Sequence, residues 1–524
     1  MKDYYLMNKD RIVAEFHSKE SRFSSDVSFE ITKTYDKMPF GVNDDITAWI
    51  SDRKAAKHRV HLKEIMEELG CYDNEGFINI THIASINDTF WAKPADSSLT
   101  WKDVSLYQNE FTEAVSSLVF EGMKRHHQDF SSTSPDHSPE LVIDGSYPKC
   151  FRKEGYTGQC GSDIFIYKRG HKDTSFEPYC EMLASEIAGV ISPDNTISYE
   201  LVSLHGKRTS KCNLFTNENI GYAPYCDFAD KNGASIEKIF EFFRKIGSEQ
   251  AFTEMLLIDA LCFNEDRHAG NYGVLFDTDT LEVLKMSPVF DLNLSLLVDA
   301  DDKAVDDIGY YFYSDVHRPK LGEDFTAMGQ FALENDTSGL LKKRVEQLKD
   351  FSFSFRGDRI FTAERVAKVE QAVRKQAEAI LSNERLQTRD VFPSEKLNAE
   401  LKQKKKIQET RKKITDNRND FMDFLDEKKF DFGDTFGSAG NDAEYIVENM
   451  DFSMTLNFEK GSVAIQDFGG KQYSLDELQT KDKGFCLVCK GVIEKLKEFS
   501  EYFGNRTFSA FLEENQPKRT DYED

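Results

Sequence analysis

The feature that most constrains this chain is a buried helix that runs directly into a dense polar loop and then a strand. Residues 249–263, EQAFTEMLLIDALCF, are apolar on most faces, which predicts a helix surrounded by other elements. The loop NEDRHAGN (264–271) follows at once, and YGVLF (272–276) is typical of a strand. An Asp-Arg-His run by itself is more often a solvated turn, so its meaning depends on the groups that the fold brings to it.

A hairpin after this loop is expected to return a second carboxylate to it. The strand turns at DTDT and comes back as LEVLKMSPVFDLNLSLL, which contains Asp291. Asp266 would then be free to act as a base, while Asn271 and Asp291 supply the oxygen ligands that Mg²⁺ prefers. Phosphoryl transfer requires little beyond these groups and a lysine on the phosphates. The combination favours catalysis over a solvated turn.

The loop and the hairpin resemble those of the HipA-like serine/threonine kinases, a family with N-x-D-x-H-x-K-N followed by a downstream Asp. The matching residues are Asn264, Asp266, His268, Asn271 and Asp291, whereas Gly270 stands where the family usually has Lys. The string D-R-H-x-x-N is also similar to the catalytic loop of phosphatidylinositol 3/4-kinases. The resemblance implies that Asp266 is the base and that Asn271 and Asp291 hold Mg²⁺. His268 would either support the γ-phosphate or brace the loop.

Two upstream segments resemble the nucleotide-binding parts of the same family. DGSYPK is similar to its phosphate loop, and IFIYK is similar to the strand that bears the ATP-binding lysine. The residues implied are Gly145, Ser146, Lys149 and Lys168. The helix EPYCEMLASEIAGV would supply the glutamate that holds this lysine. Glu177 is the better match, and Glu181, one turn later on the same face, is the alternative. Residues 213–222 would form the hinge.

The order of elements predicts an α+β fold with two lobes. Residues 140–168 are expected to form three strands, the first over 140–143, whereas 236–246 carries an amphipathic helical stripe. A chain of 524 residues exceeds a single hydrophobic core. We expect a two-lobed, HipA-like and protein-kinase-like fold, with a kinase N-lobe (140–235) and a helical kinase C-lobe (236–395). An N-terminal flanking domain (1–125) would precede the lobes, and an appended C-terminal domain (396–524) would follow them.

Composition narrows the classes of partner. With 67 Lys and Arg against 92 Asp and Glu, the net charge of −25 disfavours direct binding to nucleic acid and to anionic membranes. No signal segment or long apolar window is present, so a cytoplasmic protein is expected. Cys486 and Cys489 form the single C-x-x-C and are interpreted as packing residues. Two D-F-G strings, at 431–433 and 467–469, are set aside because neither lies on the hairpin.

The sequence therefore predicts a kinase that uses ATP and Mg²⁺ to phosphorylate Ser or Thr of a protein substrate. Autophosphorylation, at Ser146 for instance, is a further expectation, and the acidic stretch 298–315 would be the activation segment. Because some family members are toxins neutralised by a small DNA-binding protein, the resemblance also allows an antitoxin-like partner. Two alternatives stay open: a lipid or small-molecule kinase, and a nucleotide-binding interaction module without turnover.

Overall fold

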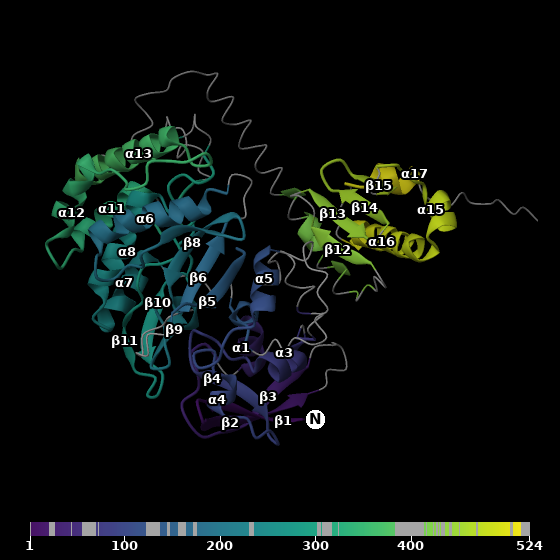
Figure 1. The fold of residues 1–524 in the computed structure, drawn as a ribbon, viewed down its shortest axis with the longest axis horizontal. Helices are drawn as coiled ribbons and strands as arrows, with labels where there is room; N and C mark the ends of the chain where they lie inside the picture. The colour runs from purple at the N-terminus through teal and green to yellow at the C-terminus, as the bar shows by residue number, and fades with distance from the viewer. Residues whose placement is uncertain are drawn as a thin grey trace, which may run out of the picture. The chain divides into compact units, whose positions relative to one another are not determined.

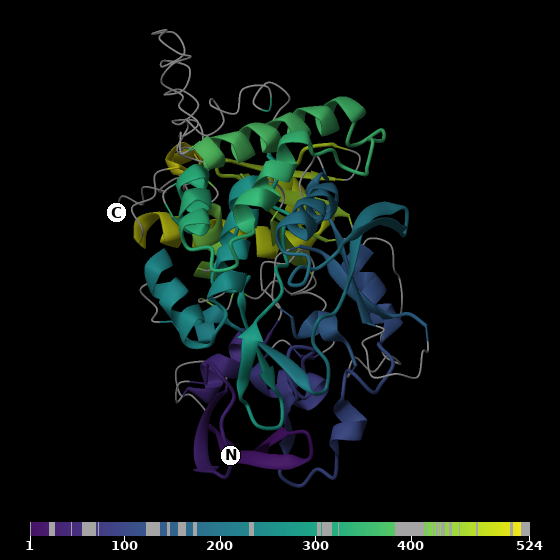
Figure 2. The same cartoon turned by 90° about the vertical axis from the view of Figure 1, so that its left-hand side faces the viewer.

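The chain divides into two compact units, Met1–Asp390 and Val391–Asp524 (Figures 1 and 2). The computed structural model describes residues 2–19, 27–42, 45–54, 66, 70–71, 73–121, 137–143, 147–155, 164–170, 175–229, 235–300, 305, 317–322, 324–382, 413–414, 417–422, 424–425, 428, 430, 435–439, 443–449, 451–467, 470–502 and 507–514. Helices and several small, mainly antiparallel sheets are mixed in both units, which confirms the α+β class.

The described residues between 2 and 121, called here the N-terminal module, are built on a four-stranded antiparallel sheet of order β3-β2-β1-β4. Its strands are β1 (Asp3–Asn8), β2 (Arg11–Lys19), β3 (Ser28–Thr34) and β4 (Phe90–Pro94). Its helices are α1 (Ile46–Asp52), α3 (Asn74–Thr81), α4 (Trp101–Val104) and α5 (Glu113–Glu121). All three tryptophans of the chain are buried in this core, which continues onto Phe151 and Ile164 of the next sheet. The module is therefore packed onto the rest of the first unit through apolar side chains.

The second sheet of this unit has the order β5-β6-β8-β7 and is antiparallel throughout. Its strands are β5 (Lys149–Lys153), β6 (Ile164–Arg169), β7 (Glu200–Leu204) and β8 (Lys207–Asn213), and helix α6 (Glu177–Ile191) contacts it. The strand expected over 140–143 is wrong, because Pro139–Leu141 form a short 3₁₀ helix, η3. Pro139 fits the start of a helical turn, and the buried Glu140 carboxylate accepts hydrogen bonds from Ser116 and from the Phe151 N–H.

A helical region and a three-stranded sheet complete the first unit. The helices are α7 (Ile236–Lys245), α8 (Glu249–Cys262), α11 (Phe325–Glu334), α12 (Leu341–Gln347) and α13 (Ala363–Ser382), with short 3₁₀ turns η4 (Tyr225–Asp227) and η5 (Leu348–Asp350). As expected, α8 is buried on all sides, and α6, α7, α11 and α13 contact it. The sheet has the order β11-β10-β9, with β9 (Ile220–Pro224), β10 (Gly273–Asp277) and β11 (Val283–Met286). The hairpin expected after the polar loop is thus β10–β11.

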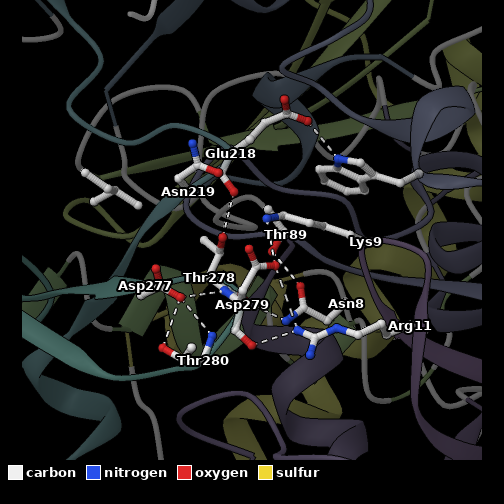
Figure 3. Close-up of polar contacts among 12 residues, drawn as sticks. Asn8, Lys9, Arg11, Thr89, Glu218, Asn219, Asp277, Thr278, Asp279 and Thr280 are labelled. Atoms are coloured by element: carbon white, nitrogen blue, oxygen red, sulfur yellow. Dashed lines mark hydrogen bonds and ion pairs between the residues drawn. The ribbon is translucent and has the colours of Figure 1, made fainter. Parts of the chain in front are cut away.

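The turn of this hairpin is held by the N-terminal module (Figure 3). The Asn8 amide donates to the Thr278 carbonyl at 2.7 Å, and Lys9 pairs with Asp279 at 2.9 Å. Arg11 donates to the Asp279 carbonyl at 2.7 Å. On the other side, the Thr278 hydroxyl donates to the Glu218 carbonyl, and the Glu218 carboxylate accepts from the Trp101 indole. The hairpin that leads to Asp291 is therefore fixed at its far end both by Glu218 and by residues of the N-terminal module that are more than 250 positions away.

The second unit contains a four-stranded antiparallel sheet of order β12-β13-β14-β15. Its strands are β12 (Phe436–Ala439), β13 (Glu444–Glu448), β14 (Phe452–Asn457) and β15 (Ser462–Asp467), and its helices are α15 (Leu475–Lys481), α16 (Lys483–Tyr502) and α17 (Ser509–Glu514). Cys486 and Cys489 are both buried in its core, which agrees with a packing role. Asp467 ends β15 and accepts from the Tyr473 hydroxyl, whereas residues 431–433 lie outside the described residues. Among the described helices of the chain, none is long and apolar enough to cross a membrane.

We expect Asn8→Ala to destabilise the first unit by about 1–3 kcal/mol, because it leaves the buried Thr278 carbonyl without its donor. The amide also accepts from the Thr89 hydroxyl at 2.6 Å, and Asn8 is only 2% exposed. The matched control is Lys37→Ala, which removes an exposed hydrogen bond to the Thr280 carbonyl of the same turn and should cost about 0.5 kcal/mol or less. Urea unfolding measures both, and equal effects would contradict a tightly held turn.

Candidate functional site

A cavity of about 810 Å³ brings together most of the residues predicted for the site. The predicted residues that line it are Lys149, Lys168, Asp266, His268, Asn271 and Asp291. The N-terminal module contributes to the same wall, among others through Gly41, Arg53 and Asp88. Gly145 and Ser146 lie outside the described residues, as does most of the stretch 298–315. The site thus joins the β5–β8 sheet, the polar loop and the end of the hairpin.

Lys168 is the centre of the charged part of this cavity. It lies near the end of β6, and its ammonium group contacts Glu181 Oε1 at 2.8 Å and Asp291 Oδ1 at 2.9 Å. Its side chain is only 14% exposed, and that of Glu181 is 1% exposed. The other carboxylate oxygen of Glu181 accepts from the Ser210 hydroxyl on the neighbouring strand β8. Lys168 therefore links helix α6 to the segment after the hairpin.

The glutamate that holds Lys168 is Glu181, which corrects the expectation that favoured Glu177. Glu177 is the first residue of α6 and lies beside Gly170, beyond the end of β6. Glu181 is one helical turn further along, on the part of α6 that packs against β6 and β8. Both glutamates are buried, so the sequence pattern alone did not separate them. The packing of the helix against the sheet decides which one reaches the lysine.

The electrostatics keep this ion pair charged. Burial by itself lowers the pKa of Lys168, but the carboxylates of Asp291 and Glu181 outweigh it and raise the pKa well above its usual value. Burial would also raise the pKa of Asp291, but the nearby Lys168 ammonium, with Lys149 and Arg267, lowers it to about 2. Asp291 is therefore an anion at neutral pH, as a metal ligand must be.

The backbone at Asp291 is strained in a way that aims its side chain. Its φ is +57°, in the left-handed region that non-glycine residues seldom adopt, at a cost of roughly 1–3 kcal/mol. Two hydrogen bonds hold it there: Asp291 N–H donates to the Tyr199 hydroxyl at 3.2 Å, and Arg267 donates to the Phe290 carbonyl at 2.7 Å. Such strain is retained where the surroundings over-determine it, often at functional sites.

Arg267 connects the polar loop to this strained segment. Its guanidinium is 1% exposed and forms a two-point ion pair with Asp259 of α8, at 2.8 and 2.9 Å. The third nitrogen donates to the carbonyls of Asn271 and Phe290, both at 2.7 Å. Neither the role of Arg267 nor the importance of Asp259 was predicted from the sequence. A signal existed, since a carboxylate within an apolar helix requires a buried partner.

Asp266 and Asn271 are fixed by hydrogen bonds within the loop. The side-chain oxygen of Asn264 accepts from the Asp266 N–H at 3.1 Å, and the Asn264 amide donates to Asp259 at 2.8 Å. The Asn271 amide donates to the Asp266 carbonyl at 3.0 Å. This leaves the Asp266 carboxylate in the cavity wall, where it forms an ion pair with Lys320.

His268 forms a hydrogen bond within the loop, and which of its two expected roles it has stays a prediction. Its Nδ1 accepts from the Gly270 N–H at 3.1 Å, which in the neutral ring places the proton on Nε2. The Tyr222 hydroxyl donates to the Gly270 carbonyl at 3.0 Å, so both polar groups of this backbone unit are engaged. The ring lies in the cavity wall, and its Nε2 is left for a second contact.

The donor chemistry at Asn271 and Asp291 fits a hard cation such as Mg²⁺. The amide nitrogen of Asn271 is used by the Asp266 carbonyl, so its oxygen is the atom left to coordinate. One carboxylate oxygen of Asp291 accepts from Lys168, and the other is left. Mg²⁺ usually takes only one or two protein oxygens together with water and phosphate oxygens. Within the described part of the chain, no group of three His, Cys, Asp or Glu side chains forms an all-protein metal site.

An aromatic cluster lines the cavity beside these polar groups and was not predicted. Phe215, Tyr222 and Phe290 lie with ring centroids 5.2–5.6 Å apart and come from the segment after β8, from β9 and from the segment before Asp291. The first two fall at or within 213–222, the stretch expected to be a hinge. Flat apolar side chains of this kind offer a slot for a planar ring.

No protein-family model matches the chain, and no curated protein is similar to it at a significant level. Several solved structures are similar, two of which are named here. One is the Helicobacter pylori proinflammatory kinase CtkA, at 15% identity and a TM-score of 0.33, over 45% of this chain and 90% of that one. The other is a chain from the complex of the Shewanella oneidensis MR-1 toxin–antitoxin system HipA and HipB with operator DNA, at 13% identity and a TM-score of 0.45, over 72% and 97%.

The chain is thus similar in structure to HipA-like kinases, at low sequence identity.

We expect Arg267→Met to destabilise the protein by about 3–5 kcal/mol, because it leaves the Asp259 carboxylate buried without a partner. The double variant Arg267→Met/Asp259→Leu removes both charges and should be less destabilised than Arg267→Met alone. Thermal and urea unfolding of the full-length protein measure both effects. If the double variant were at least as unstable as Arg267→Met, the unpaired Asp259 carboxylate would not be the source of the effect.

Proposed function

We propose that this protein is a Mg²⁺-dependent kinase of HipA-like type that transfers the γ-phosphoryl group of ATP to Ser or Thr of a protein. One observation carries the proposal: Lys168, held by Glu181, contacts Asp291, and Arg267 ties the Asp291 segment to the loop that bears Asp266. A phosphate-binding lysine, a metal-binding carboxylate and a base are the groups that phosphoryl transfer requires. In this proposal the β5–β8 sheet and α6 form the small lobe, and the helical region forms the large one.

The charged groups divide into those that hold the nucleotide and those that hold the metal. Lys168 would bind the α- and β-phosphates, and Lys149, which lies opposite it in the β5–β6 register, would bind phosphate together with Gly145 and Ser146. Asn271 and Asp291 would hold Mg²⁺, which neutralises charge on the phosphate oxygens. The aromatic cluster of Phe215, Tyr222 and Phe290 would contact the adenine ring.

Asp266 is placed to act on the acceptor hydroxyl. Its backbone is fixed by Asn264 and Asn271, while its carboxylate faces the cavity. It would accept the proton of the attacking hydroxyl as the bond to the γ-phosphorus forms, and His268 would keep the loop in shape. A base of this kind contributes typically about 10²–10⁴-fold in rate.

A protein acceptor is favoured over a lipid. The net charge of −25 opposes binding to anionic vesicles. A lipid or small-molecule kinase and a nucleotide-binding module without turnover are the alternatives that experiment must separate. An antitoxin-like partner stays a prediction, because no described surface singles out its binding site.

Asp266→Asn should lower transfer of phosphate from labelled ATP by about 10²–10⁴-fold, since an amide cannot take the proton of the acceptor. Binding of Mg·ADP should change little, because Asp266 is not assigned to the nucleotide. Mass spectrometry of the labelled protein identifies the acceptor residue. Unchanged transfer in this variant would contradict the assignment of Asp266 as the base. Binding of Mg·ATP without transfer in the wild type would favour the module without turnover, and label found only in added phosphoinositide vesicles would favour the lipid kinase.

Glu181→Gln should weaken binding of Mg·ATP by about tenfold, because Lys168 loses the charged partner that positions it. Glu177→Gln is the matched control: it makes the same change four residues earlier in α6, on a glutamate that is equally buried. Calorimetric titration of both variants gives the comparison. A larger loss of affinity in Glu177→Gln would show that the pairing of Lys168 is different when nucleotide is bound.

A further inference from the structure

The polar loop itself offers no free cation to the phosphoryl group that it would handle. Phosphoryl transfer concentrates negative charge on the γ-phosphoryl oxygens, next to the base, and positive groups must offset it. Glu265 and Asp266 are both acidic, Gly270 has no side chain, and Arg267 is buried with all three nitrogens engaged. Lys168 is committed to Glu181 and Asp291. Arg267 and Lys168 therefore both already hold other groups of the protein.

A separate segment, residues 317–322 (HRPKLG), brings two basic side chains onto the loop. The His317 ring contacts both carboxylate oxygens of Glu265 at 3.0 Å, and the Lys320 ammonium contacts Asp266 Oδ1. His317 and Lys320 are three residues apart, and each pairs with a different one of the adjacent carboxylates Glu265 and Asp266. The side chain of Lys320 is 50% exposed, so it has room to move when a substrate arrives.

The backbone on either side of Lys320 is anchored. Pro319 and Leu321 are buried, and Leu321 belongs to the main core of the first unit. Gly322 follows with φ +81°, and a Cβ there would lie 3.0 Å from Ile236 of α7. The backbone that carries Lys320 is therefore fixed, while its exposed ammonium group contacts Asp266.

We propose that Lys320 is a catalytic residue that donates hydrogen bonds to the γ-phosphoryl oxygens beside Asp266. This inference rests on the proposed kinase function. In the step, the bond from the acceptor oxygen to the γ-phosphorus forms and the bond to the bridging oxygen of ADP breaks, while the acceptor proton passes to Asp266. Lys320 contacts both Asp266 and the γ-phosphoryl oxygens once ATP is bound, and it shifts fully to the phosphoryl group as Asp266 loses its charge. The interaction strengthens as the reaction proceeds, so it should raise kcat.

The test compares Lys320→Met with Arg318→Met, a control that removes an exposed positive charge from the same segment. Three quantities are measured on the full-length protein: kcat for loss of label from γ-labelled ATP, the affinity for Mg·ADP and the affinity for Mg·β,γ-imido-ATP. Lys320→Met should lower kcat by about 10²–10³-fold. It should also weaken the imido analogue by about tenfold while leaving ADP unchanged. Lys320→Arg should retain most of both, and Arg318→Met should resemble the wild type.

Two outcomes overturn the inference. If Lys320→Met keeps the wild-type preference for the imido analogue over ADP, the lysine does not contact the γ-phosphoryl group. If His317→Ala lowers kcat and this preference as much as Lys320→Met does, docking of the segment is responsible instead of the lysine. A wild-type protein that binds both nucleotides but transfers no phosphate would contradict the kinase proposal, while the binding preference still decides whether Lys320 contacts the γ-phosphate. A melting temperature near the wild-type value shows that each variant is folded.

Discussion

The geometry of the site depends on the buried ion pair between Arg267 and Asp259. Asp259 is fixed in the last turn of α8, where every residue from Met255 to Cys262 is buried, and it holds the guanidinium at two points. The remaining nitrogen of Arg267 then fixes the carbonyls of Asn271 and Phe290. A buried charge pair of this kind adds little net stability, but losing one partner is costly. Its effect is to set the position of two loops relative to one helix.

Lys168 completes this arrangement from the side of the sheet. It links Glu181 of α6 to Asp291, so the sheet, the helix and the end of the hairpin meet at one ammonium group. The far end of the hairpin is held by Asn8, Lys9 and Arg11 of the N-terminal module. Asp291 is therefore fixed both through its own side chain and through the hairpin that leads to it. This double constraint allows the backbone of Asp291 to keep a positive φ.

Local patterns in the sequence were enough to predict several parts of the fold. The apolar run at 249–263, the amphipathic stripe at 236–246 and the helix starting at Glu177 all form helices close to their expected bounds. The hairpin and the return of Asp291 could also be predicted, because a short antiparallel pair leaves little freedom. The strand expected over 140–143 was wrong, because Pro139 and the buried contacts of Glu140 favour a 3₁₀ turn.

The sequence by itself determined which chemical groups were available: two carboxylates, an amide and a histidine around a hairpin, with a lysine on an upstream strand. Only the tertiary structure decided which of them meet. It selected Glu181 over Glu177, gave Arg267 its partner in α8, and brought Lys320 to Asp266 from a segment more than 50 residues away. The physical reason is that local periodicity reports which face of an element is apolar. Pairings between distant charges depend on how helices and sheets pack, and that is set by the whole core.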